Sequence, residues 1–322
     1  MSGEMGDASG RRLQGGKAPM SGLTLVAIDL GGTKATVAVV AADGRVLGRS
    51  SVPTPRAHPR TSLEGFRERA AELPGFAEAA AVGMALPAIV GEAGEVHWAA
   101  RSALEWADFP AGAELSAIFG LPSSVRFDGY AAALGEAVFG VGRGFRSVLT
   151  IIVGTGMGAG VCIDGQLLPG SVGVAGAVGW DRWPLDESRL SGPAESIASG
   201  PGILRAARGG GRAADYPDTA AVFRAAHAGD RVARAAVAAA ATVAGSVAGS
   251  AVNLVAPEVV VWTGGVGSRA DFSAAATRVA RRCCQPFAAR RTRFVRSRLG
   301  AESSLMGAAA GALAVVEGRS SR

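Results

Sequence analysis

The stretch SVLTIIVGTGMGAGVCIDG, residues 147–165, decides the fold. It begins as a β-branched apolar run, then carries glycine at every second position from Gly154 to Gly160, and continues as a second apolar run that ends in Asp-Gly. β-Branched runs favour strands, and Asp-Gly is typical of a tight hairpin turn. The stretch therefore predicts two strands joined by a glycine-rich turn, not a strand that leads into a helix.

The same plan occurs earlier in the chain. Residues 23–44 read LTLVAIDLGGTKATVAVVAADG, and a third apolar run follows at residues 45–52. Strand, glycine turn and strand in succession predict a meander. Two copies of one glycine-interrupted hairpin indicate two related domains.

The segments around these copies suggest how the chain is divided. We expect a disordered tail at 1–21, an N-terminal domain at 22–127, a C-terminal domain at 128–300, and a last helix at 301–317 that packs back on the N-terminal domain. Between the copies, helices are predicted at 61–73 and 112–120, and strands at 80–86 and 123–127. After the second copy come a long alanine-rich helix at 230–255 and a β-branched strand at 258–262.

Composition excludes several classes of protein. Three cysteines in 322 residues, two of them adjacent, form no disulfide framework and no paired ligand motif, which fits a reducing cytoplasm. The three histidines are scattered, so no structural metal is expected. No uncharged apolar segment is expected to reach the roughly 18 residues of a membrane span, and no membrane partner is expected.

The net charge of +6 arises largely from arginines within residues 281–298. Arginines 293 and 296 are out of step with strict strand alternation, and no helix-turn-helix or aromatic platform accompanies the cluster. We favour a solvated surface over a nucleic-acid site. Nucleic-acid binding remains an alternative that predicts steep salt dependence.

Glycine-rich turns bind phosphate because backbone N–H groups can approach the anion closely. Neither cluster matches the P-loop pattern. Gly154, Gly156 and Ala159 satisfy the letters of the dinucleotide fingerprint, but the β-branched residues that follow cannot open the helix which that fingerprint requires. Both turns are therefore hairpin tips, which could face each other and hold a nucleoside triphosphate. A third glycine loop, TGGVGS at residues 263–268, follows a strand.

With AIDLGGTK, GTGMGAG and TGGVG in this order, the chain resembles the ROK family of sugar kinases and sugar-responsive repressors, within the actin, hexokinase and Hsp70-like fold. The resemblance implies an α/β fold of two ribonuclease-H-like domains with ATP in the cleft between them. Asp29 would hold Mg²⁺ directly or through water, and Lys34 could contact phosphate or belong to the surface. The implied nucleotide contacts are Gly31, Gly32 and Thr33, then Gly154, Thr155, Gly156 and Gly158, and, against the adenosine, Gly264 and Gly265.

Asp128 follows the strand at 123–127 and precedes an alanine-rich helix. This is the position of a helix N-cap, and capping alone could explain the residue. The resemblance instead places the family's catalytic aspartate here. A kinase needs a carboxylate to accept the proton of the attacking hydroxyl, so we assign Asp128 as the base.

Departures from the family pattern concern the sugar. Where the family has Gly-Glu-x-Gly-His, this chain reads GAVGW, which puts Trp180 in place of a sugar- and zinc-binding histidine, and the family's zinc knuckle is absent. Phe127 replaces the asparagine before the base, and Glu195 matches the family's other sugar-binding acid. Arg101 aligns loosely with a further substrate position. Trp180 could stack on a ring or fill the volume vacated by the knuckle.

These departures shape the expected function. We expect an ATP- and Mg²⁺-dependent kinase acting on a primary hydroxyl of a modified hexose, an aminosugar or a C7 cyclitol. The family includes such kinases in antibiotic pathways. The alternative is a non-catalytic sugar-binding or sensor protein. The short tail carries no helix-turn-helix, which favours the kinase branch, and the resemblance implies a homodimer.

Overall fold

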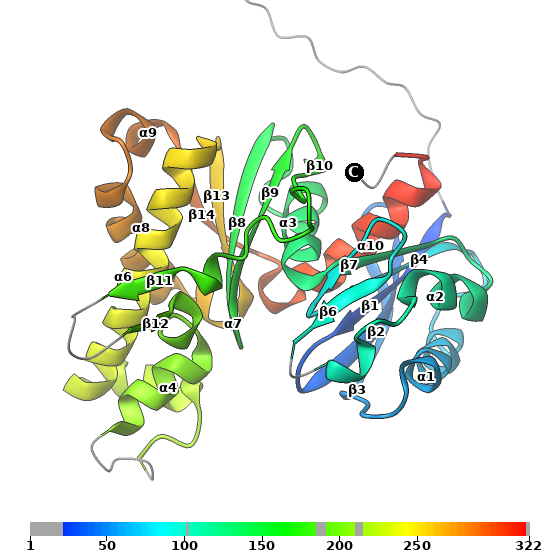
Figure 1. Ribbon diagram of the computed structural model, residues 1–322, viewed down its shortest axis with the longest axis horizontal. Coiled ribbons are helices and arrows are strands. Elements are labelled where there is room, and N and C mark those ends of the chain that lie inside the picture. The colour runs from blue at the N-terminus through cyan, green and yellow to red at the C-terminus, as the bar shows by residue number, and fades with distance from the viewer. Residues whose placement is uncertain (1–21, 101–102, 185–190, 210–214, 320–322) are drawn as a thin grey trace, which may run out of the picture.

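A computed structural model describes residues 22–100, 103–184, 191–209 and 215–319. The chain forms two lobes, each built around a five-stranded sheet, and the two sheets lie side by side (Figure 1). The expected α/β fold of two related domains is confirmed, because the strand order in the two sheets is the same.

The first sheet has the order β3-β2-β1-β4-β7. Its strands are β1 (Thr24–Leu30), β2 (Lys34–Ala41), β3 (Val46–Pro53), β4 (Ala79–Leu86) and β7 (Ser123–Phe127). The first three strands pair antiparallel as the predicted meander, and β4 and β7 join parallel to β1. The side chains of β1 and β2 are almost all buried, as expected for strands at the centre of a sheet that is covered on both faces.

The second sheet repeats this plan in the order β10-β9-β8-β13-β14. Its strands are β8 (Ser147–Val153), β9 (Met157–Ile163), β10 (Gln166–Leu167), β13 (Val259–Thr263) and β14 (Arg293–Arg296). Strands β8, β9 and β10 form an antiparallel meander, and β13 and β14 add parallel to β8. The glycines of residues 154–156 therefore make the tip of a hairpin, as the sequence predicts.

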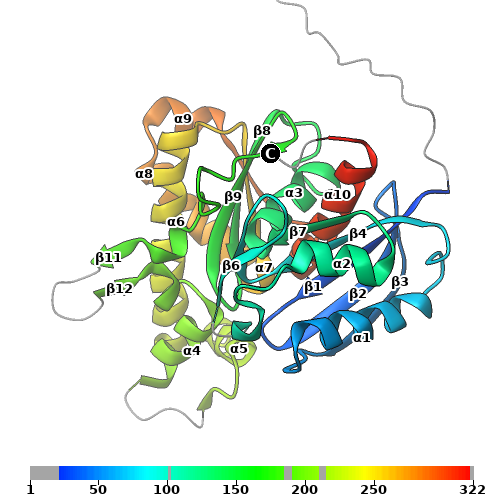
Figure 2. The same ribbon diagram turned by 45° about the vertical axis from the view of Figure 1, so that its right-hand side comes forward.

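Helices α1 (Pro59–Ala71) and α2 (Ala111–Phe119) cover the outer face of the first sheet (Figure 2). They enclose a core in which Phe66 and Trp106 are fully buried. A small two-stranded sheet of β5 (Ala88–Val90) and β6 (Val96–Ala99) lies beside this core, and the sequence pattern gave no prediction for it.

The second lobe is covered by α4 (Gly200–Arg208), α5 (Thr219–His227), α6 (Arg231–Val255), α8 (Ala270–Cys283) and α9 (Pro286–Arg291). The expectation that no segment reaches membrane-spanning length is wrong for α6, which is long and apolar enough by composition. Its buried face packs on α8 and α5 and contributes to the core of the lobe. Alanine and glycine account for much of the composition of α6, and their small side chains allow neighbouring helices to pack closely against it. The core position accounts for α6 without a membrane.

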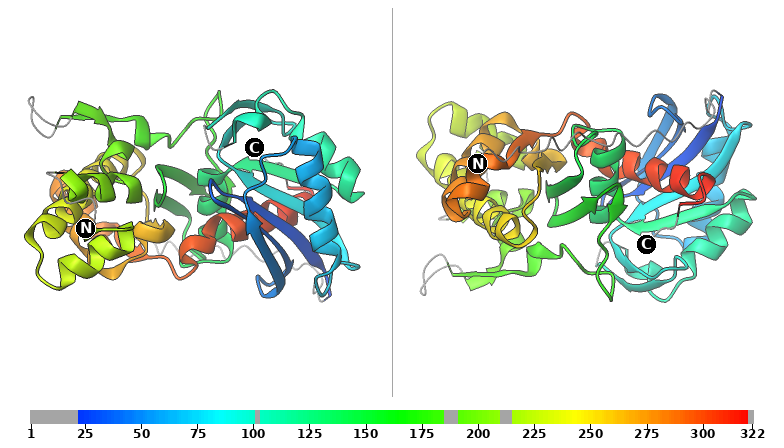
Figure 3. Two further views of the ribbon diagram at one scale, coloured as in Figure 1. Left: turned by 90° about the horizontal axis from the view of Figure 1, so that it is seen from below. Right: turned by 90° about the horizontal axis from the view of Figure 1, so that it is seen from above.

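Two helices cross between the sheets: α3 (Asp128–Val138) and α10 (Ser303–Val316). Helix α3 packs on β9 and β8, and α10 packs on β4 and β1 of the first lobe (Figure 3). The two helices touch through glycine: a Cβ added to Gly307 would lie 1.6 Å from the carbonyl oxygen of Ala131. We propose Asp128 as the boundary between the lobes, with α10 returning to the first.

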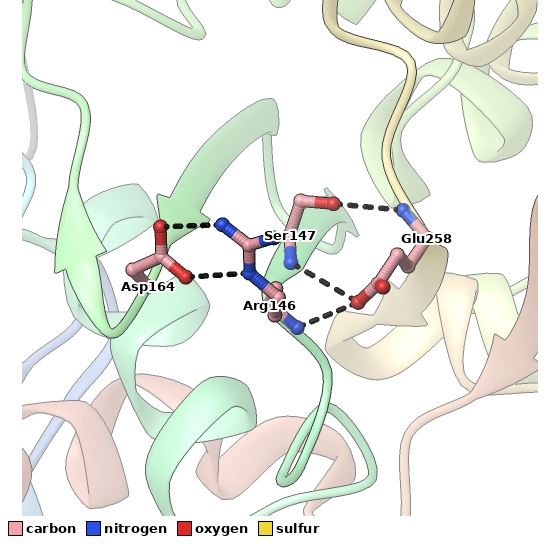
Figure 4. Close-up of polar contacts among 4 residues, drawn as sticks. All are labelled: Arg146, Ser147, Asp164 and Glu258. Atoms are coloured by element: carbon pink, nitrogen blue, oxygen red, sulfur yellow. Dashed lines mark hydrogen bonds and ion pairs between the residues drawn. The ribbon is translucent and has the colours of Figure 1, made fainter. Parts of the chain in front are cut away.

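The ends of β8 and β13 remote from the glycine turn are joined by side chains (Figure 4). Glu258 accepts the backbone N–H of Arg146 at 2.6 Å, and Ser147 Oγ accepts the N–H of Glu258 at 3.0 Å. The Arg146 guanidinium donates to both carboxylate oxygens of Asp164, at 3.0 and 3.2 Å. This bond lowers the pKa of Asp164. These contacts join the start of β8 to the end of β9 and to the start of β13.

Candidate active site

The first glycine turn connects β1 to β2 and follows directly after Asp29. The N–H of Gly31 donates to the carbonyl of Lys34 at 3.0 Å, which closes the turn. The loop after β3 holds the turn from outside, since Thr54 Oγ1 donates to the Gly31 carbonyl at 2.6 Å and Thr54 N–H donates to the Thr33 carbonyl at 3.1 Å. The backbone of the turn is therefore fixed before any ligand binds.

The second glycine turn connects β8 to β9. The N–H of Gly154 donates to the Gly156 carbonyl at 2.9 Å, and the N–H of Gly200 donates to the Gly154 carbonyl at 2.8 Å. Gly200 is the first residue of α4, so this helix begins against the turn. A helix N-terminus carries unsatisfied N–H groups and favours negative charge nearby. Thr155 and Gly156 thus belong to a turn that lies beside a helix N-terminus, whereas Gly158, expected in the same turn, is the second residue of β9.

The third glycine loop lies against the second turn. It forms α7 (Gly264–Gly267), a single short turn after β13. Gly264 has φ +84°, and a Cβ there would lie 2.5 Å from the carbonyl oxygen of Val153, so only glycine fits. A Cβ on Gly154 would be 3.8 Å from the N atom of Gly265. The loop that carries Gly264 and Gly265 therefore adjoins the second turn.

Asp128 is the first residue of α3, at the end of β7. The N-cap position belongs to Phe127, which makes no side-chain capping bond, so the N-cap position expected for Asp128 is off by one residue. Burial raises the pKa of Asp128 to about 7, and the charges of Asp29 and Glu195 add to this rise, while the N–H of Gly129 lowers it. A carboxylic acid that titrates near neutral pH suits a general base.

Asp29 lies one residue from the end of β1 and is partly buried. Burial raises the pKa of Asp29 to about 6, and the charge of Lys34 opposes this rise. The charges of Asp29 and Glu195 both act on Asp128, so each of these two carboxylates lies within electrostatic range of it. Among the described residues, no three His, Cys, Asp or Glu side chains are grouped so that they could hold a metal ion by themselves. Mg²⁺ is commonly held by one or two carboxylates together with substrate phosphates and water, so the single carboxylate of Asp29 is compatible with it.

Glu195 connects the carboxylates to the second turn. It lies in the short helical turn η3 (Ala194–Ser196), and its Oε2 accepts the backbone N–H of Met157 at 3.0 Å. A Cβ on Gly156 would lie 2.6 Å from the same Oε2. Asp29 thus precedes the first turn, Glu195 contacts the residue that follows the second, and the charges of both act on Asp128.

The residues expected to contact substrate lie in different surroundings. Phe127 packs edge-on against Tyr130, with ring centroids 5.5 Å apart. Trp180, in η2 (Val178–Trp180), is 70% exposed, so its side chain does not fill an interior volume. Arg101 lies outside the described residues.

Phe127 also lines a cavity of about 1000 Å³ between the β5–β6 sheet and residues 169–174. This cavity does not include Asp29, Asp128 or Glu195. We therefore separate it from the site, which the carboxylates and the glycine turns define.

Sequence reasoning missed two features of this site. Thr54 bonds to the first glycine turn from a loop that carries no motif. The hydroxyl of its side chain was the one sequence feature that could have indicated this contact. The contact of Glu195 with Met157 joins residues 38 apart in sequence, which no local pattern specifies.

Two five-stranded sheets of the same strand order, each with a glycine turn after its first strand, are typical of the actin-like ATPase fold, and solved structures of that fold match this chain. A ROK family glucokinase from Streptomyces griseus, in complex with glucose and AMPPNP, superposes with a TM-score of 0.74 at 28% identity, covering 90% of this chain and 99% of that one. The sequence model of the ROK family matches residues 25–315 of this chain, so the chain belongs to the ROK family.

Curated relatives agree with this assignment over part of their length. The glucokinase of Streptomyces coelicolor is 35% identical over 197 residues, which is 58% of this chain and 59% of the relative. The N-acetylmannosamine kinase of Escherichia fergusonii is 34% identical over 193 residues, which is 58% of this chain and 65% of the relative. The matched segment thus spans less than two thirds of either relative.

Proposed function

We propose that this protein is an ATP- and Mg²⁺-dependent kinase that phosphorylates a hydroxyl of a hexose-like sugar. The observation that carries the proposal is the position of Asp128, whose pKa is raised to about 7 by burial and by the charges of Asp29 and Glu195, which flank the two glycine turns. Family membership and the similarity to kinases of glucose and N-acetylmannosamine support the same reaction class.

In this proposal the glycine turns bind the phosphates of ATP through backbone N–H groups, and Gly264 and Gly265 lie against the adenosine. Mg²⁺, held by Asp29, would neutralise phosphate charge. Asp128 accepts the proton of the substrate hydroxyl as that oxygen forms a bond to the terminal phosphorus, the bond from this phosphorus to the bridging oxygen breaks, and ADP leaves. Phosphoryl transfer depends mainly on such positioning and charge stabilisation. Lys34, whose charge acts on Asp29, supplies a cation at the first turn.

We further propose that the substrate is a modified sugar, an aminosugar or a C7 cyclitol, phosphorylated at a primary hydroxyl. Ala177 and Phe127 offer no hydroxyl partner where the family pattern has Glu and Asn. A buried polar group without a partner costs about 1–3 kcal/mol, so such a site disfavours an unmodified glucose ring. The exposed indole of Trp180 is suited to cover the apolar face of a ring. Glu195 keeps a carboxylate oxygen for one substrate hydroxyl.

A coupled assay of ADP release over glucose, mannose, N-acetylmannosamine, aminosugars and cyclitols tests both levels of the proposal. We expect turnover with at least one modified ring and a lower kcat/KM for glucose. If glucose is clearly the best substrate, the modified-substrate proposal is wrong but the kinase remains. If no ring polyol supports turnover while sugars still bind, the alternative of a non-catalytic sugar-binding protein holds.

We also propose a cytoplasmic homodimer that acts without nucleic acid. The arginines of residues 281–298 are exposed, and three guanidinium groups of this region lie over phenylalanine rings. Such stacking accounts for part of the cluster within the protein itself. Size-exclusion chromatography with light scattering, and retention on DNA at low and high salt, test the two statements.

A further inference from the structure

A buried carboxylate lies at the crossing of the two lobes, outside the catalytic group. Glu136 in α3 is completely buried, two helical turns after Asp128. Its Oε1 accepts the hydroxyls of Ser297 and Ser303, the latter at 2.7 Å, and its Oε2 accepts the N–H of Val141 at 3.3 Å. These donors come from three separate segments of the chain.

The hydrogen bonds continue to the end of β13. Ser303 Oγ lies 2.5 Å from Thr263 Oγ1, and the N–H of Gly300 donates to Ser297 Oγ at 2.7 Å. Each hydroxyl has one proton. Ser303 Oγ lies 2.7 Å from Glu136 Oε1 and 2.9 Å from the Gly300 carbonyl oxygen, so it has two further acceptors besides Thr263. When its proton goes to Glu136, its oxygen can accept the proton of Thr263. A chain of hydrogen bonds thus runs from Thr263 through Ser303 to the carboxylate.

Thr263 directly precedes the third glycine loop. It holds the N-cap position of α7, yet its hydroxyl makes no capping bond to that helix. Threonine at an N-cap usually accepts an N–H of the helix that follows. Here the hydroxyl is turned instead toward Ser303 and the carbonyl of Gly300, at 2.5 and 2.9 Å. The position of Gly264 is therefore tied to α3 and α10.

Burial of the Glu136 carboxylate has a cost in free energy. Among the described residues, no Lys, Arg or His forms an ion pair with Glu136. A buried carboxylate without a counter-charge is unfavourable unless hydrogen bonds satisfy it, and an apolar side chain of similar size would avoid this cost. In return, the Glu136 carboxylate holds the segments of Val141, Ser297 and Ser303 in a fixed arrangement.

We propose that Glu136, acting through Ser303 and Thr263, is a positioning residue for ATP: it holds the loop of Gly264 and Gly265 at a fixed place relative to α3, the helix that presents Asp128. The inference rests on the proposed role of these two glycines in binding adenosine. It assigns a part in ATP binding to residues that do not touch the nucleotide.

The test uses Thr263→Val, which keeps the shape of the side chain and removes the hydroxyl, and Thr263→Ser, which restores it. We expect Thr263→Val to raise the Kd of AMPPNP about tenfold by titration calorimetry, the factor that one lost hydrogen bond accounts for. Thr263→Ser should return the Kd to within about twofold of wild type. The KM for the sugar should not change.

Ser303→Ala breaks the same series of hydrogen bonds at the residue between Thr263 and Glu136. The double variant Thr263→Val with Ser303→Ala should bind AMPPNP no more weakly than either single variant, because both break one chain of bonds. The matched control is Ser116→Ala, whose hydroxyl donates to the Leu121 carbonyl at 2.7 Å in the first lobe and should leave the Kd unchanged.

A purely structural role gives a different result: the variants would lose thermal stability yet bind AMPPNP with the wild-type Kd, which overturns the inference. If Thr263→Val does not fold, Ser303→Ala decides alone. If wild-type protein itself does not bind AMPPNP, the proposed function fails and the inference fails with it. Normal binding by wild type and by both variants removes only the inference.

Discussion

The backbone N–H of Met157 donates to Oε2 of Glu195 at 3.0 Å, so a carboxylate expected to bind substrate lies directly on the second glycine turn. Burial is the main cause of the raised pKa of Asp128, and the charges of Asp29 and Glu195 add to it. Glu195 therefore contacts the residue after the second turn and also acts on the proposed base.

Replacing Asp128 by Asn should reduce kcat by about 10²–10⁴-fold, because the amide cannot accept the proton of the attacking hydroxyl. AMPPNP binding should persist, since the glycine turns are unchanged.

In wild type, kcat/KM should rise with pH through about 7, as Asp128 becomes ionised. A flat profile between pH 5.5 and 8 would show that Asp128 is not the base.

The raised pKa of Asp128 also makes stability depend on pH. The pKa rises from 3.8 in the unfolded chain to about 7 in the folded protein, so the contribution of this carboxyl to stability is complete below about pH 4 and is lost as the pH rises through 7. Asp128→Asn cannot ionise. Without Mg²⁺ and nucleotide, its Tm should therefore exceed that of wild type at pH 8 and approach it near pH 4. A Tm below that of wild type at pH 8 would contradict the assigned shift.

Gly156→Ala should disrupt the contact between Glu195 and the turn. The new Cβ would lie 2.6 Å from Oε2, and the flexible carboxylate would move away and lose the N–H of Met157. We expect a loss of about 1 kcal/mol in the free energy of unfolding, measured by urea titration. In the Glu195→Ala background the same change should cost much less.

The control for this experiment is Gly158→Ala, because a Cβ on Gly158 meets no atom within 4 Å. Its stability should stay near that of wild type. Equal losses for Gly156→Ala in both backgrounds would mean that Glu195 does not contact the turn.

Gly307→Ala tests the crossing of α3 and α10. The added Cβ would lie 1.6 Å from the Ala131 carbonyl oxygen, which is backbone that cannot rotate away, so the helices must separate. A loss of about 3 kcal/mol or more in unfolding free energy is expected. Gly65→Ala in α1 serves as control: no atom lies within 4 Å of the new Cβ, and alanine should stabilise that helix by about 0.5–1 kcal/mol. Similar Tm values for both variants would argue against the close crossing.

Local patterns predicted the hairpins, the duplication and most of the long elements. Strand β7 occupies residues 123–127 as predicted, between the turn at Gly120 and Pro122 and the alanine-rich segment that forms α3. The β5–β6 sheet escaped prediction because its strands are short and separated by charged and glycine residues. Its pairing depends on the neighbouring core, not on a local pattern.

Contacts between distant residues were beyond the reach of the sequence. Glu136 lies in the run ALGEAVFG, where a charged residue at a buried helical position was the one available signal. Its partner Ser303 lies 167 residues away. The expectation that no uncharged apolar segment reaches membrane-spanning length was wrong, because residues 235–255 of α6 carry no charged side chain. The packing of α6 on α8 shows why that composition suits a core helix.

The most direct test of the central claim is a crystal structure of the wild-type protein with AMPPNP and Mg²⁺. We predict the phosphates between residues 31–33 and 154–158, the adenosine against Gly264 and Gly265, and the Asp128 carboxylate facing the terminal phosphate across the space for the substrate hydroxyl. A nucleotide bound elsewhere, or phosphates in contact with only one of the two glycine turns, would contradict the proposed function.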